Sequence, residues 1–188
     1  MNTYVLLLRG INVGGKNKMP MRELRLFLEE QGFTNVATYI QSGNVLLQSK
    51  LDAKTLAQNI EEGLPKRFRL DSSIIRVLVL TQARLQAVID NKPAGFGEQP
   101  EKYYSDVIFL MGIDSARAIA AFDPREGIDK VWQGDGVIYS QRLGAERVKS
   151  RLNKIMSTPL YKSMTIRNWN TTTKLLQLLK EIDADKKT

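Results

Sequence analysis

Residues 3–18 read TYVLLLRGINVGGKNK, an apolar run that passes through an arginine into a glycine-rich basic loop. The run Val5–Leu8 is continuously apolar and suits β-structure, which predicts a central strand covered on both faces. The three glycines that follow permit backbone conformations that other residues avoid. The stretch therefore predicts a buried strand that carries a loop of backbone amides, together with Lys16, toward an anion.

The loop partly matches the P-loop pattern of nucleoside triphosphatases. Gly10, four further residues, Gly15 and Lys16 fit its first seven positions. Asn17, however, stands where the pattern requires a hydroxyl for magnesium, and Pro20 places the start of the next helix too late. These departures argue against a P-loop enzyme. They leave open an anion site of another kind and a plain glycine connection with solvated lysines.

Composition limits the chemistry that the chain can perform. Its 188 residues suffice for one large domain or two small ones, and 43% of them are apolar, as in ordinary globular proteins. The chain contains no cysteine and no histidine, which excludes disulfides, Cys nucleophiles, His bases and the usual zinc sites. We expect no metal site. No apolar run resembles a signal peptide or a membrane span, so we expect a cytoplasmic protein without membrane contact.

The net charge of +8 is unevenly distributed. The segment Arg142–Lys174 holds eight basic residues and one acid, and Arg9–Arg25 holds five basic residues and one acid. Such concentration of positive charge indicates an anionic partner, for which nucleic acid is one candidate.

Hydrophobic periodicity predicts the same order of elements twice. In residues 1–92 the order is strand, helix, strand, strand, helix, strand and a trailing helix, and SGN at 42–44 forms a tight hairpin. Residues 93–188 repeat this order with GDG at 134–136 as the second hairpin, after a loop at 91–102 rich in proline and glycine. The predicted strands are Val5–Leu8, Val36–Gln41, Val45–Gln48, Ile74–Leu80, Asp106–Met111, Lys130–Gln133, Val137–Gln141 and Met164–Asn168. Predicted helices follow the caps Asp52, Thr81 and Asp114, with Pro65 ending the first of these three, and further helices lie at Met21–Leu28, Glu146–Met156 and Thr171–Glu181.

This repeat predicts an α+β fold of two ferredoxin-like halves, at residues 1–92 and 93–188. Each half is expected to hold an antiparallel four-stranded sheet backed by helices. A single mixed sheet is the alternative that the pattern leaves open.

Two basic segments are candidate binding sites. On the predicted helix Glu146–Met156, Arg147, Arg151 and Lys154 share one face without an acidic partner, which suits nucleic acid, although such a face is also typical of a solvated helix. In TIRNWNTTTK at 165–174, Arg167 and Trp169 precede a helix that Asn170 or Thr171 is expected to cap. A helix amino terminus, a guanidinium and an aromatic ring suit a phosphate or carboxylate with a stacked ring. The alternative is a capped helix with Trp169 in the core.

Three spaced motifs resemble one known family. LLRGINVGGKNKMPMREL at 7–24, YIQSGNVLL at 39–47 and TIRNWNT at 165–171 are similar to the bacterial family named domain of unknown function 1697. The resemblance implies two ferredoxin-like subdomains and carries no activity. The residues that match its signatures are Arg9, Gly10, Asn12, Gly14, Gly15, Lys16, Ser42, Gly43, Asn44, Arg167, Asn168, Trp169, Asn170 and Thr171.

The leading hypothesis is an anion-binding protein for nucleic acid or a nucleotide-like phosphate. The alternatives are an enzyme that acts on a small phosphorylated substrate without His or Cys, and a partner-binding protein with a basic face. At least two of the three polar clusters are expected to meet around one concave, positive site. The predicted ligand-binding residues are Arg9, Asn12, Gly14, Gly15, Lys16, Ser42, Asn44, Arg167, Trp169, Asn170 and Thr171.

Overall fold

The computed structural model describes residues 1–71 and 75–184. Its backbone divides into two compact units, which are Met1–Leu85 with Lys174–Thr188 (unit 1) and Gln86–Thr173 (unit 2). The predicted halves, residues 1–92 and 93–188, place the last helix in the second half, whereas most of this helix belongs to unit 1. Thr3 Oγ1 donates a hydrogen bond to Asp183 on that helix, which ties its end to the first strand.

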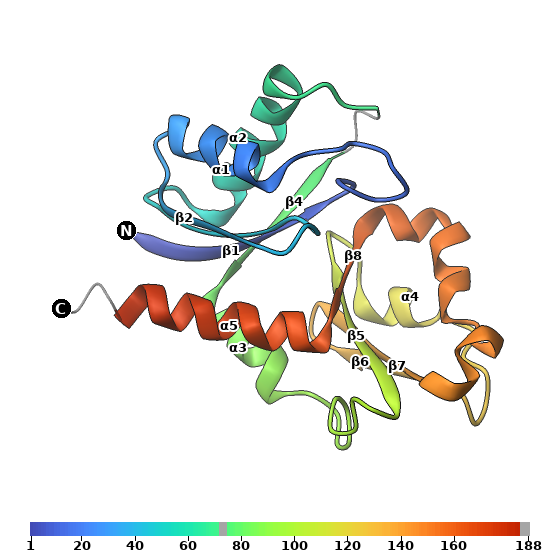
Figure 1. Cartoon of the computed structure of the whole chain (residues 1–188). Coiled ribbons are helices and arrows are strands. Elements are labelled where there is room, and N and C mark those ends of the chain that lie inside the picture. Colours follow the sequence, from blue (N-terminus) through green and yellow to red (C-terminus); the bar gives the residue numbers. More distant parts are fainter. Residues whose placement is uncertain (72–74, 185–188) are drawn as a thin grey trace. The chain divides into compact units, whose positions relative to one another are not determined.

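Unit 1 contains an antiparallel sheet with strand order β2-β3-β1-β4, and α1 and α2 lie on one of its faces (Figure 1). Strand β1 is central, as the apolar run predicts. Leu6 and Leu8 face the helices, whereas Val5 and Leu7 point to the opposite face, and all four are buried. The elements are β1 (Asn2–Arg9), α1 (Met21–Glu30), β2 (Thr34–Tyr39), β3 (Asn44–Ser49), α2 (Ala53–Arg67) and β4 (Arg76–Thr81). Helix α3 (Gln82–Asp90) begins in unit 1 and belongs to unit 2 from Gln86 onward.

Unit 2 repeats this topology with the order β6-β7-β5-β8. Equivalent backbone hydrogen bonds show which residues of the two sheets correspond to one another. Leu8 N donates to Gly43 O at 2.8 Å in unit 1, and Leu110 N donates to Gly136 O at 3.0 Å in unit 2. Both predicted hairpins therefore occupy the same place in their sheets. The elements are β5 (Tyr103–Leu110), α4 (Ser115–Ile119), β6 (Asp129–Gly134), β7 (Val137–Leu143), the 3₁₀ turns η1 (Gly144–Lys149), η2 (Leu152–Ser157) and η3 (Pro159–Ser163), and β8 (Met164–Asn168). Helix α5 (Trp169–Ala184) begins in unit 2 and belongs to unit 1 from Lys174 onward.

The predicted α+β class with two ferredoxin-like halves is thus confirmed. The predicted caps at Asp52, Thr81 and Asp114 each accept a backbone N–H at the start of a helix. Helix α2 continues past Pro65 to Arg67, because a proline removes only one backbone hydrogen bond and this one lies in the last turn. Ile74, where the predicted fourth strand begins, lies outside the described residues.

The prediction of a helix over Glu146–Met156 is wrong. The backbone forms two 3₁₀ turns there, and Ser150 between them is extended, with φ −61° and ψ 142°. The cause is the buried Asp129, whose Oδ2 accepts the backbone N–H of Arg151 at 2.8 Å and that of Arg125 at 3.0 Å. The N–H of Arg151 donates to Asp129 and so does not donate to the backbone carbonyl four residues earlier. A continuous α-helix therefore ends at this point. Val148, expected on the apolar face, is 86% exposed.

Candidate functional site

The glycine loop after β1 closes on itself as a tight turn. Gly14 and Gly15 have φ of 57° and 76°, and Lys16 N donates to Val13 O at 3.0 Å. Both glycines adopt the left-handed conformation that such a turn requires and that other residues resist. The next helix begins only at Met21. A P-loop needs its lysine at the start of the helix, so this geometry excludes one.

Asn12 closes the base of the loop with both ends of its amide. Its Nδ2 donates to Met19 O at 2.9 Å and to Gln41 O at 3.0 Å, and its Oδ1 accepts from Met19 N at 2.7 Å. The backbone of Asn12 has φ 54°, a conformation that asparagine tolerates better than most residues. The predicted ligand-binding amide is therefore engaged within the protein, where it sets the shape of the loop.

Asn17 is a second clamp, which the sequence analysis had treated only as a departure from the P-loop pattern. Its side chain is buried, donates to Gly10 O at 2.7 Å and accepts from Asp71 N at 2.7 Å. Its backbone N donates to Asp71 Oδ2 at 2.7 Å. The two bonds to Asp71 attach the loop to the segment before β4, and the bond to Gly10 holds the two ends of the loop together. An asparagine between two lysines in a glycine-rich loop is the signal that could have indicated this role.

The SGN hairpin lies directly against the glycine loop. Asn44 is fully buried and donates to Tyr39 O at 3.0 Å and to Ser42 Oγ at 2.9 Å, so its side chain closes the turn. A Cβ atom on Gly43 would stand 2.9 Å from the Cδ1 atom of Ile11. Only glycine permits this close approach. The structure thus brings together two of the three predicted clusters, through residues that hold the backbone in place.

Basic side chains surround this end of the unit 1 sheet. Arg9 and Arg76 are directly opposed on the antiparallel strands β1 and β4. Both point to the face opposite α1 and α2, since the alternating neighbours Leu8 and Val77 belong to the core beneath those helices. Lys16 is exposed and forms no ion pair with any residue in the described part of the chain. Arg76 lies within the predicted strand Ile74–Leu80, and its place opposite Arg9 could not be predicted, because strand pairing is not visible in sequence.

Arg167 belongs to unit 2 and is 7% exposed. Its Nη1 donates to Thr165 Oγ1 at 2.9 Å and to Ile166 O at 2.8 Å. Burial lowers the pKa of Arg167 to about 10, while Tyr161 acts in the opposite direction. The guanidinium is therefore protonated at neutral pH, and at least one of its two terminal nitrogens is engaged with β8 itself.

Trp169 packs in the interior of unit 2. Its ring lies 5.2 Å from that of Phe96 at an interplanar angle of 76°, and a Cβ on Gly97 would meet it at 2.3 Å. The cap of α5 is Asn168, whose Oδ1 accepts from Asn170 N at 2.9 Å. The predicted caps Asn170 and Thr171 are therefore wrong by two residues or more, because helix α5 begins at Trp169.

The basic segment before β8 does have an acidic partner. Arg151 Nη1 and Lys154 Nζ approach Asp123 Oδ2 at 3.2 and 3.0 Å, which corrects the expectation of a face without acids. Hydrogen bonds from Lys154, the desolvation that opposes them and the charges of both cations leave the pKa of Asp123 below its usual value. Arg147 stands apart, because it is exposed and forms no ion pair with the described residues.

Neither a metal centre nor a membrane segment emerges from the part of the chain that the structure describes. Within residues 1–71 and 75–184, no three His, Cys, Asp or Glu side chains are placed to hold a metal ion. No helix in these ranges combines the length and the apolar character that crossing a membrane requires.

Comparisons with known proteins agree with the motif resemblance. The family described as Protein of unknown function (DUF1697) matches residues 1–139. A solved structure of a conserved bacterial protein from Streptococcus pneumoniae is similar to the chain at 28% sequence identity, with a TM-score of 0.77. The similarity covers 95% of this chain and 98% of that chain. No curated protein matches.

Proposed function

Because the chain belongs to the family of proteins of unknown function DUF1697, its role has to be argued from its own residues, and we propose that unit 1 binds a phosphate-bearing anion beside Arg9 and Arg76. Arg9 ends the central strand β1, from which the glycine loop departs, and Arg76 begins the neighbouring edge strand β4. The proposal places this binding in the cytoplasm, where phosphorylated metabolites are concentrated.

The opposed arginine pair is the observation that carries the proposal. Side chains directly opposite on antiparallel strands have Cβ atoms about 4.5–5.5 Å apart, and like charges in such a pair destabilise the sheet. Like charges directly opposed in this way cost up to about 1 kcal/mol. An anion between Arg9 and Arg76 replaces this repulsion by two attractions. Phosphate suits the pair, because each guanidinium can donate two parallel hydrogen bonds to its oxygens.

The loop adds charge and rigidity to the same end of the sheet. Lys16 and Lys18 are exposed on it, and the Gly14–Gly15 turn presents its backbone at the surface. Asn12 and Asn17 hold the loop with hydrogen bonds of 2.7–3.0 Å. A loop that is already ordered loses less conformational entropy when a ligand binds, which strengthens the affinity.

The compact arrangement favours a small phosphate over a nucleic acid. Binding of a polyanion needs an extended surface of basic side chains. Arg151 and Lys154, in the basic segment before β8, are instead paired with Asp123. The dependence of the affinity on salt concentration distinguishes the two ligand classes, because the affinity for a polyanion falls steeply with salt through counterion release. Turnover of a phosphorylated compound by the wild-type protein would favour the enzyme hypothesis. Capture of an acidic protein by the same face would favour the partner-binding hypothesis.

Replacing either arginine by glutamine should weaken phosphate binding by about 10- to 100-fold, because a charge-assisted hydrogen bond contributes about 1.5–3 kcal/mol. In the absence of ligand, Arg9→Gln and Arg76→Gln should each remain folded. The measurements are calorimetric titration with inorganic phosphate and with pyrophosphate, and urea unfolding without ligand.

Arg25→Gln is the matched control. Arg25 lies on α1, on the other face of the sheet, where it pairs with Glu29 at 2.8 Å. This variant should bind phosphate as the wild-type protein does. Wild-type affinity in both Arg9→Gln and Arg76→Gln would overturn the proposed site.

A further inference from the structure

Unit 2 contains a hollow of about 530 Å³ that the proposed function does not use. It lies at the end of β5 and β7, beside the turns η1 and η2. Its polar lining consists of Tyr104, Asp106, Arg142, Arg147, Ser150 and Asn153. The volume lies within the usual range for small-molecule sites, about 300–1,000 Å³.

The internal repeat explains why the sheet is open here. In unit 1 the second connection between strands is α2, a helix of 15 residues that buries Leu56, Ile60 and Leu64 against the sheet. In unit 2 the same connection consists of short 3₁₀ turns, of which η2 buries Leu152 and Ile155. Because these turns cover less of the sheet than a helix of four turns, a hollow is left.

The residues beneath the hollow are polar where the repeat is apolar. The equivalent hydrogen bonds of Leu8 and Leu110 align Asp106 with Tyr4, and the register then aligns Ser140 with Leu47. Tyr4 and Leu47 belong to the hydrophobic core of unit 1. Replacing core side chains by a carboxylate and a hydroxyl costs stability, so this change points to a site maintained for binding.

An ion pair forms the charged wall of the hollow. Arg142 Nη2 lies 3.1 Å from Asp106 Oδ2, and the two side chains are only 21% and 15% exposed. Arg142 Nη1 donates to Asn153 Oδ1 at 2.9 Å, which fixes the guanidinium from a second side. Arg147 adds a second positive charge, which no described residue neutralises with an ion pair. The hollow therefore carries a net charge of +1 that favours an anion.

Tyr104 supplies an aromatic surface. Its side chain is 46% exposed although it lies in a strand, and a Cβ on Gly144 would lie 3.4 Å from its ring. The ring therefore lies close to the backbone of Gly144 at the edge of the hollow. An exposed ring beside cationic groups is suited to stacking a nucleobase, a contact worth about 1–3 kcal/mol per base in single-stranded nucleic-acid complexes.

We propose that this hollow binds a mononucleotide. Arg147 holds the phosphate, the base stacks on Tyr104, and the carboxylate of Asp106 with the polar groups of Ser150 and Asn153 meets the edge of the base. A mononucleotide combines the three features that the lining demands, which are one anionic group, one planar ring and ring-edge donors for a carboxylate. This site is independent of the phosphate site proposed in unit 1.

The test is calorimetric titration with AMP, GMP, CMP and UMP, with the four nucleosides and with inorganic phosphate. It uses the Arg9→Gln protein, so that phosphate binding in unit 1 contributes little. At least one mononucleotide should saturate below about 1 mM and bind more than tenfold more tightly than phosphate or its own nucleoside. Adding Arg147→Gln should weaken this mononucleotide by about tenfold or more and its nucleoside little. Adding Tyr104→Leu should weaken both.

Arg117→Gln is the matched control, because Arg117 is an exposed arginine of unit 2 on α4, outside the lining of the hollow. It should leave the affinity unchanged. Thermal unfolding shows whether each variant is folded, and Tyr104→Phe, which keeps the ring, should bind as the parent does. The proposal is overturned if no mononucleotide saturates, if phosphate binds equally well, or if Arg117→Gln weakens binding as much as Arg147→Gln. Failure of the unit 1 site would appear separately, as unchanged phosphate binding in Arg9→Gln and Arg76→Gln.

Discussion

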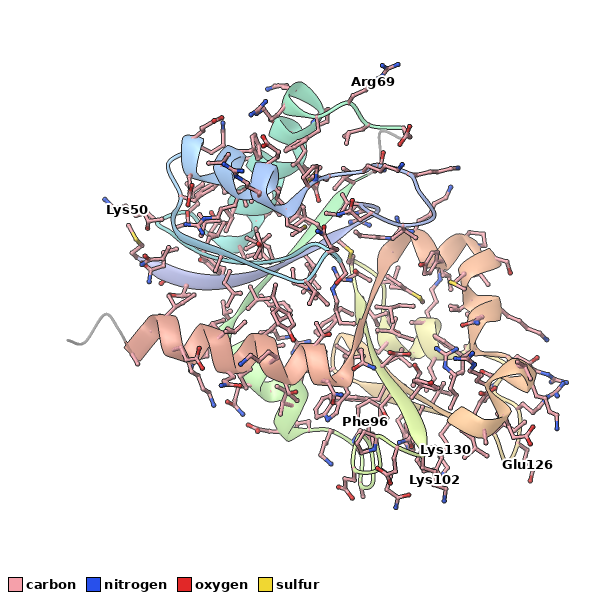
Figure 2. All side chains as sticks on the ribbon, viewed as in Figure 1. Lys50, Arg69, Phe96, Lys102, Glu126 and Lys130 are labelled. Carbon is pink, nitrogen blue, oxygen red and sulfur yellow. The ribbon has the colours of Figure 1, made fainter. Side chains whose placement is uncertain are left out.

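Phe96→Ala should lower the free energy of unfolding by about 3–5 kcal/mol, the usual cost of removing a large aromatic side chain from a core. Phe96 is 0% exposed and is labelled in Figure 2 in the loop between α3 and β5. Its ring makes edge-on contacts with those of Trp132, Tyr139 and Trp169 at 6.0, 5.2 and 5.2 Å. Its removal leaves a cavity between three rings that cannot all move inward.

Urea unfolding measures this loss, and near-ultraviolet circular dichroism should show weaker tryptophan bands as the neighbouring rings become mobile. Phe122→Ala is the control from the same unit. Phe122 is only partly buried and packs against the hydrophobic cluster of unit 2 that contains Ile108 and Leu110. It should cost less than half as much. Equal losses for the two variants would show that Phe96 is not a central core residue of unit 2.

Asn17→Gly should lower the free energy of unfolding by about 1–3 kcal/mol and weaken phosphate binding at the same time. The substitution removes the two partly buried side-chain hydrogen bonds of Asn17, to Gly10 O and from Asp71 N, and each such bond contributes about 0.5–1.5 kcal/mol. Glycine is the appropriate replacement, because φ at this position is 46° and alanine would add backbone strain. Asn17→Asp should be at least as harmful, since it places a buried carboxylate beside Asp71.

Asn35→Gly is the control for this experiment. Asn35 also has a positive φ, of 50°, but it is exposed, and its Nδ2 donates to Gln48 Oε1. We expect a loss of about 0.5–1.5 kcal/mol, because one hydrogen bond is removed, and unaltered phosphate binding. If Asn17→Gly loses stability but keeps wild-type affinity for phosphate, the loop is a structural element and takes no part in the proposed site.

Local pattern was sufficient for the order of elements. Periodicity and turn residues predicted every strand of both sheets, and β8 was predicted from Met164 to Asn168, as the structure has it. These predictions succeed because alternation, caps and positive-φ turns depend on residues within a few positions of one another. The helix over Glu146–Met156 failed, because the group that interrupts it, Asp129, lies 22 residues from Arg151.

The candidate sites depended on contacts between distant parts of the chain. Arg9 and Arg76 become neighbours only when β1 pairs with β4, and the partner of Asn17 is Asp71, 54 residues away. The sequence by itself determined that the chain forms two repeated α+β halves with a concentration of positive charge. The tertiary structure alone decided which charges stand together and which polar side chains hold the backbone, because strand pairing and burial join residues that no local pattern relates.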